Sequence, residues 1–230
     1  MNAQGMLEQL LKSGLSMVEG KARAPGAPAG GDAGWGKFGA GAAAGGALGL
    51  LLGSKRGRSF GGKALKLGSV AAIGVMAYKA YESWQAQQAQ AGRPPSTAAA
   101  PAEPRTVNLL PAPEVEQHSR AMLLSMIAAA KADGHLDERE RGLVEAELQR
   151  IAADPPTRRW FEDEMRRPLD PAEVARAAGT PEMAAEMYLA SLLVADDTSF
   201  MERAYLDELS RQLRLPEGLK QHLERQAAAV

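Results

Sequence analysis

Apolar residues in the second half of the chain recur three and four positions apart, the spacing that places them on one face of an α-helix. The period-two alternation that is typical of strands does not occur. The clearest apolar stripes are Met122, Leu123, Met126, Ile127 and Ala130; Leu143, Val144, Leu148 and Ile151; Met183, Met187, Ser191, Leu192, Val194 and Ala195; and Leu206, Leu209 and Leu213. The pattern predicts an all-α domain of about seven short helices over residues 114–230.

The predicted helices carry clear start signals. A side-chain oxygen placed before the first turn can accept from a free backbone amide, and proline is favoured at the first helical position. Three positions fit a capping box with a glutamate three residues later: Asp137 with Glu140, Asp170 with Glu173, and Ser199 with Glu202. Proline follows Asp154, Asp170 and Thr180. We therefore expect helices to begin at these five places.

The first half of the chain has a different pattern. Residues 1–19 predict an amphipathic helix with its apolar face on Met6, Leu7, Leu10, Leu11 and Leu15. Residues 20–37 are rich in Gly, Pro and Ala without periodicity, which indicates a linker. Residues 85–113 begin polar and become rich in Ala and Pro, which indicates a spacer before the helical domain.

The segment 38–84 between linker and spacer contains two apolar stretches, residues 38–54 and 67–78. Gly41, Gly45, Gly49 and Gly53 recur every four residues, which on a helix gives a smooth face for close helix packing. Neither stretch reaches the roughly 20 apolar residues of a comfortable membrane span. A basic cluster between them nevertheless favours membrane association through residues 38–84, with self-association through the glycine face. The alternative is a flexible tether or a water-soluble pair of glycine-rich helices.

Charge separates the two halves. Residues 1–100 carry 11 Lys and Arg against 4 Asp and Glu, whereas residues 101–230 carry 16 against 24. This asymmetry suggests different partners for the two halves, and the acidic second half disfavours nucleic-acid binding. Cysteine is absent, which excludes disulfides and thiolate zinc sites.

The stretch KADGHLDERE, residues 131–140, gathers Asp133, Asp137 and Glu140 around a glycine and a histidine. A weak internal repeat relates it to the region of Asp196 and Asp197, so pseudo-symmetric helix pairs could bring these carboxylates together. Oxygen ligands of this kind suit a divalent cation such as calcium or magnesium, although the spacing is not that of an EF-hand. The alternative is a plain corner between two helices, in which Asp137 and Glu140 only cap the second one.

Other chemistry is sparse. His118, His135 and His222 show no i, i+4 pairing, and we expect all three at the surface. No nucleophile elbow or phosphate-binding loop is present, so the sequence predicts that the protein is not an enzyme. Trp160 and Phe161 are predicted to anchor the core.

The chain resembles a known family at these residues. AAAKADGHLDERER is similar to the helix corner of TerB-like tellurite-resistance domains, and DTSFMERAYLDELSRQLRLPEGLKQHL resembles the end of YebE-type inner-membrane proteins. The resemblance implies a TerB-like helical bundle on a membrane-associated N-terminal segment, without established enzymatic activity. It also implies an acidic metal-binding surface, which maps onto Asp133, Asp137, Glu140, Asp196 and Asp197.

Two functional hypotheses follow. The first is a non-enzymatic membrane protein whose acidic helical domain docks a protein partner, in envelope, metal or oxyanion stress. The second is a divalent-cation sensor that uses the Asp133–Glu140 corner. The resemblance implies the inner membrane, and the basic residues between the apolar stretches predict that residues 114–230 lie on its cytoplasmic side.

Overall fold

The structure is a computed structural model, and it describes residues 2–9, 70–90, 105–132, 154–195 and 199–228. All regular elements in these ranges are helical, which confirms the predicted fold class. The 20–37 linker, the glycine-rich stretch 38–54 and the basic cluster after it lie outside the described residues. None of the described helices combines the length and apolarity needed to cross a membrane.

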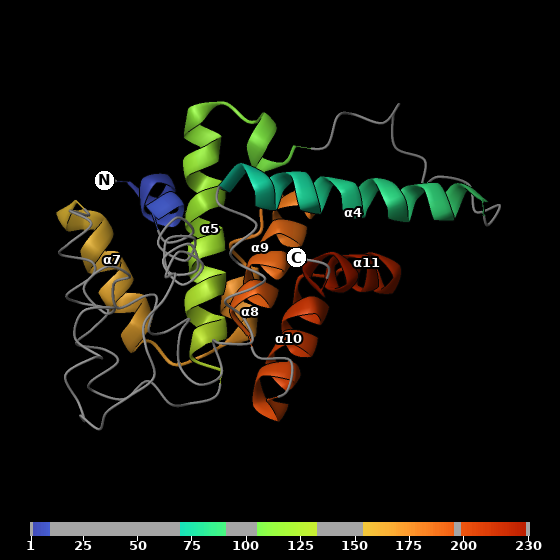
Figure 1. Cartoon of the computed structure of the whole chain (residues 1–230). Coiled ribbons are helices and arrows are strands. Elements are labelled where there is room, and N and C mark those ends of the chain that lie inside the picture. The colour runs from blue at the N-terminus through green and yellow to red at the C-terminus, as the bar shows by residue number, and fades with distance from the viewer. Residues whose placement is uncertain (1, 10–69, 91–104, 133–153, 196–198, 229–230) are drawn as a thin grey trace, which may run out of the picture.

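Two helices form the centre of the molecule (Figure 1). These are α5, Ala112–Ala130, and α9, Pro181–Val194, which make the most extensive contact between any two described elements. His118 near the start of α5 contacts Glu186 of α9. Seven residues later on α5, Ser125 contacts Ser191, which lies five residues later on α9, so the contacts advance in the same direction along both helices. The helices therefore run in the same direction, and both end on the same side of the domain.

Shorter helices surround this pair (Figure 1). The 3₁₀ turn η2, Val107–Leu109, precedes α5. Two helices contact α5: α7, Pro155–Arg166, and α8, Pro171–Ala175. Two others pack on α9: α10, Phe200–Gln212, and α11, Glu217–Ala228. The helix starts follow the sequence signals. Asp154 accepts from Thr157 N at 2.9 Å and Thr180 from Met183 N at 3.1 Å. Asp170 also caps its helix, although its oxygen accepts from Ala172 N rather than from the third amide that a capping box uses.

The cap at Asp154 has an electrostatic signature. The hydrogen bond from the Thr157 backbone amide stabilises the ionised carboxylate, and it lowers the pKa of Asp154 below its ordinary value of 3.8. A carboxyl whose folded-state pKa is lowered contributes stability above its unfolded pKa and loses it as the pH falls through the folded value. This cap is therefore fully formed at neutral pH.

Helix α4, Val70–Gln90, crosses the predicted boundary at residue 84 and continues into the predicted spacer. Its stripe Val70, Ile73, Ala77 and Ala80 is buried, because α4 packs across η2, α9 and α11. At one end Gly74 allows α4 to approach Asn108. At the other, a Cβ atom on Gly218 would come within 2.9 Å of the Trp84 ring, so α11 approaches the indole closely there. The end of segment 38–84 thus lies in the core of the helical domain.

Residues 3–9 form a short helix that is hydrogen-bonded to α5. Both carboxylate oxygens of Glu116 accept from its first amides, Ala3 N at 2.7 Å and Gln4 N at 3.0 Å. Met6 and Leu7 are completely buried, as the predicted apolar face requires. A negative charge at a helix N-terminus is favourable, because the free amides there carry partial positive charge.

Candidate functional site

The most unusual polar group in the described chain is a carboxylate inside the apolar core. Glu186 lies on the second turn of α9, in a run of buried residues, and its side chain is completely buried. Burial of an ionised carboxylate is costly unless hydrogen bonds replace its water. The candidate site therefore consists of Glu186 and the groups that form hydrogen bonds with its carboxylate.

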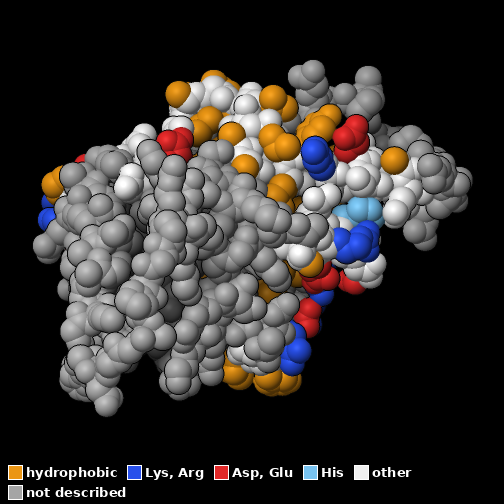
Figure 2. Space-filling model, in the orientation of Figure 1, with side chains coloured by type: hydrophobic (Ala, Val, Ile, Leu, Met, Phe, Trp, Pro, Cys, Tyr) orange, Lys and Arg blue, Asp and Glu red, His pale blue; other side chains and the backbone are white. Residues whose placement is uncertain are grey.

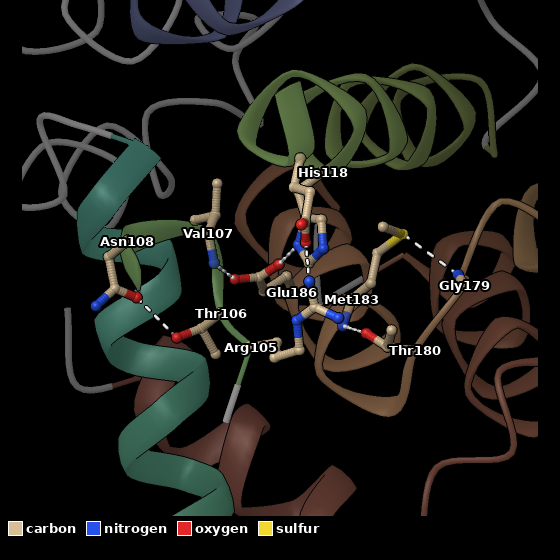
Figure 3. Close-up of polar contacts among 10 residues, drawn as sticks. Arg105, Thr106, Val107, Asn108, His118, Gly179, Thr180, Met183 and Glu186 are labelled. Carbon is tan, nitrogen blue, oxygen red and sulfur yellow. Dashed lines mark hydrogen bonds and ion pairs between the residues drawn. The ribbon is translucent and has the colours of Figure 1, made fainter. Parts of the chain in front are cut away.

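Glu186 has one partner for each oxygen (Figure 3). Oε1 accepts from the backbone amide of Val107 at 2.5 Å, and Oε2 lies 2.5 Å from Nδ1 of His118. With the carboxylate ionised, Nδ1 of His118 is the donor of this hydrogen bond, because an ionised carboxylate can only accept. The pair joins three segments: the start of α5, the middle of α9 and the η2 turn.

The surroundings of the pair are closed. The side chains of His118 and Glu186 are 4% and 0% exposed, so no substrate reaches either group in this structure. On the outer side Arg105 forms an ion pair with Glu114. Thr106 donates to the side-chain oxygen of Asn108 at 2.8 Å and orders the turn that presents Val107. The geometry is that of a structural tie between elements.

The prediction that the histidines lie at the surface is wrong for two of the three. His118 was expected at the surface but is buried, and His222 is buried as well, with Nδ1 2.7 Å from the Gly218 carbonyl. His135 lies outside the described residues. The signal that could have revealed the pair is a single glutamate within the apolar run of α9, because a carboxylate on a buried face requires a partner.

A second polar cluster lies where α9, α10 and α11 meet. The Tyr188 hydroxyl donates to Glu224 at 2.9 Å, and Lys220 donates to Asp207 at 2.7 Å. Burial, with the charge of Glu224 as a smaller cause, raises the pKa of Tyr188 far above its ordinary value, so the hydroxyl stays protonated. This cluster fastens α11 to the rest of the domain.

The predicted metal and helix-packing residues cannot be located from this fold. Asp133, Asp137, Glu140, Asp196 and Asp197 lie outside the described residues, as do Gly41, Gly45, Gly49 and Gly53. Within the described ranges, no three acidic or histidine side chains gather as a metal-binding group. Trp160 and Phe161 were predicted to anchor the core, and Phe161 is indeed buried there. Trp160 is partly buried against the core, with Cζ of Arg120 4.6 Å from the centre of its ring.

Comparison with known proteins places the chain among uncharacterised relatives. An uncharacterized protein encoded in the ampR 5' region of Yersinia enterocolitica is 30% identical over 110 residues, which cover 48% of this chain and 79% of that protein. No solved structure matches. The model of a protein family of unknown function, DUF533, matches residues 37–227, from before the glycine-rich stretch to the end of α11. The chain therefore belongs to the DUF533 family.

Proposed function

We propose that the chain is a non-enzymatic, membrane-associated protein whose helical domain docks a protein partner at the start of α10. The observation that carries this proposal is the exposure of two adjacent large apolar side chains. Phe200 is 74% and Met201 is 57% exposed on the first turn of α10. Aromatic residues and Met are enriched in protein interfaces, and adjacent exposed ones mark interaction sites.

The start of α10 is exposed although the rest of the helix is well packed. Tyr205, Leu206 and Leu209 supply the buried face of α10. Hydrophobic side chains show at the lower edge of the molecule in Figure 2, where the lower end of α10 lies in Figure 1. Phe200 and Met201 are therefore not needed to hold α10 in place, and their apolar area is free for a partner.

The chemistry of the core supports a docking role rather than catalysis. The buried pair His118 and Glu186 is fully used in joining α5, α9 and η2. The resemblance to TerB-like domains and YebE-type inner-membrane proteins supports attachment at the inner membrane through the part of segment 38–84 that precedes α4. In this proposal the helical domain lies on the cytoplasmic side.

A photo-crosslinking side chain at position 200 of the full chain tests the docking surface in living cells. We expect a defined adduct with one protein in the membrane fraction. Because a central aromatic contact is worth about 2 kcal/mol or more, Phe200→Ser with Met201→Ser should weaken binding of the purified partner at least tenfold. The melting temperature of this variant should stay close to that of the parent, since both side chains are exposed.

Leu109 supplies the matched control, because it is 55% exposed and belongs to a different element, η2. A crosslinker at position 109 should not form the same adduct, and Leu109→Ser should leave partner affinity unchanged. Equal adducts from positions 109 and 200, or full affinity after both serine substitutions, would show that the start of α10 is not the docking surface.

A cation-binding function is the second candidate, and the direction of α5 and α9 favours it. The two helices run in the same direction, so α5 ends at Ala130 and α9 ends at Val194 on the same side of the domain. The predicted acidic residues follow these two positions in the sequence. Carboxylates converging there would suit calcium or magnesium.

Millimolar calcium or magnesium should raise the melting temperature of the full chain if this second function holds, because a ligand that binds only the folded state stabilises it. Asp133→Asn should abolish the increase, whereas Asp163→Asn should preserve it, because the Asp163 side chain is exposed on α7. A melting temperature that ignores both cations would remove the sensor hypothesis.

A further inference from the structure

A pocket of about 510 Å³ lies between α8, the start of α9 and the end of α10. Its size is within the usual range for sites that hold small molecules, about 300–1,000 Å³. Its apolar lining includes Ala175, Ala184 and Leu213. Small alanine side chains leave room that a larger apolar group could fill.

The described residues that line this pocket carry charges of one sign. Among them, the charged ones are Arg176, just after α8, and Arg214, in the turn between α10 and α11. The surrounding half of the chain is acidic, with 24 Asp and Glu against 16 Lys and Arg over residues 101–230. A pocket lined by two arginines favours an anion, because opposite charges attract.

Arg214 is available for such a ligand. Its guanidinium has no ion pair or hydrogen bond with any residue in the described ranges. Its backbone has a φ of 54°, a left-handed conformation that is uncommon for residues other than Gly, Asn and Asp. Arg176 forms an ion pair with Glu173 through one nitrogen, and the guanidinium group retains further donors.

We propose that this pocket binds a small amphipathic anion, a carboxylate or phosphate monoester with a short aliphatic chain. The two guanidinium groups hold the head, since arginine pairs well with carboxylate and phosphate. The alanine and leucine side chains receive the aliphatic chain. The proposal is independent of partner docking, because Phe200 and Met201 lie at the opposite end of α10 from Leu213.

Calorimetric titration of the full chain with four probes tests the proposal: hexanoate, hexyl phosphate, hexanol and inorganic phosphate. We expect hexanoate or hexyl phosphate to bind, and the stronger of the two identifies the head group. Hexanol lacks the charge and inorganic phosphate lacks the chain, so each should bind at least tenfold more weakly. Equal affinity for inorganic phosphate and hexyl phosphate would overturn the proposed role of the apolar wall.

Two variants locate the binding on the protein. Arg214→Asn removes the charge with a residue that tolerates left-handed backbone, and it should raise the Kd about tenfold or more. Gly179→Leu narrows the pocket, and a Cβ atom at Gly179 would meet nothing within 4 Å, so the variant should fold normally and bind weakly. Arg211→Gln is the matched control, because Arg211 is exposed, pairs with Glu208 and lies outside the pocket.

The pattern across these variants decides the result. Loss of binding in Arg214→Asn and Gly179→Leu, with parental affinity in Arg211→Gln and an unchanged melting temperature, supports the pocket. Parental affinity in Arg214→Asn or Gly179→Leu would overturn it. The absence of binding of hexanoate and hexyl phosphate at millimolar concentration would overturn it as well.

Discussion

Replacement of Glu186 by alanine is expected to lower the free energy of unfolding by about 3 kcal/mol or more, because it removes the acceptor of two buried hydrogen bonds and leaves a cavity. Three consequences add together. The Val107 amide loses its acceptor, His118 loses the carboxylate beside Nδ1, and a cavity remains within the core. Urea denaturation followed by circular dichroism would measure the loss.

Glu182→Ala is the control for this experiment, because Glu182 lies one turn earlier on α9 and is only partly buried. We expect it to cost less than about 1 kcal/mol, as surface substitutions do. A double-mutant cycle with His118→Ala should show that the two substitutions are not additive, since the side chains are in contact. A cost below about 1 kcal/mol for Glu186→Ala would contradict the structural role of the pair.

Gly74→Ala is expected to destabilise the protein by about 1–3 kcal/mol through overpacking, although alanine favours helices more than glycine does. A Cβ atom at this position would lie 2.5 Å from Asn108 Oδ1, 2.8 Å from Val107 Cγ1 and 3.0 Å from Asn108 N. The backbone nitrogen cannot move away without disturbing η2, and Val107 also holds Glu186. The substitution should therefore separate α4 from η2 and weaken the buried pair.

Gly179→Ala is the matched control, because a Cβ atom there would meet nothing within 4 Å. It should leave the melting temperature unchanged or raise it slightly, since alanine restricts the unfolded chain. Hydrogen exchange would locate the effect of Gly74→Ala: faster exchange in α4 and η2 is expected, with α10 unaffected. Unchanged stability and exchange would show that α4 does not depend on the close approach at Gly74.

The sequence by itself determined the helical class and several helix starts. Both depend on interactions between residues a few positions apart. The caps at Asp154, Asp170, Thr180 and Ser199 form within three residues, so their signals are visible in the sequence. The apolar stripes of α5 and α10 reflect the helical repeat and lie largely in the core. In α9 burial extends around almost the whole helix, whereas Leu192 and Val194 of its predicted stripe are only partly buried. The predicted metal and glycine-zipper residues lie outside the described part of the chain and remain predictions.

Only the tertiary structure decided which polar residues meet and where α4 belongs. His118 and Glu186 are 68 positions apart, and Glu116 lies 113 positions from the amide of Ala3 that it caps. No periodicity encodes such pairs, because the packing of α5 against α9 brings them together. The apolar stripe of α4 would suit a membrane surface or a protein core equally well. Close contacts at two glycines place α4 in the core. Gly74 of α4 lets η2 approach, and Gly218 of α11 lets Trp84 of α4 approach, because a residue with a side chain would not fit at either point.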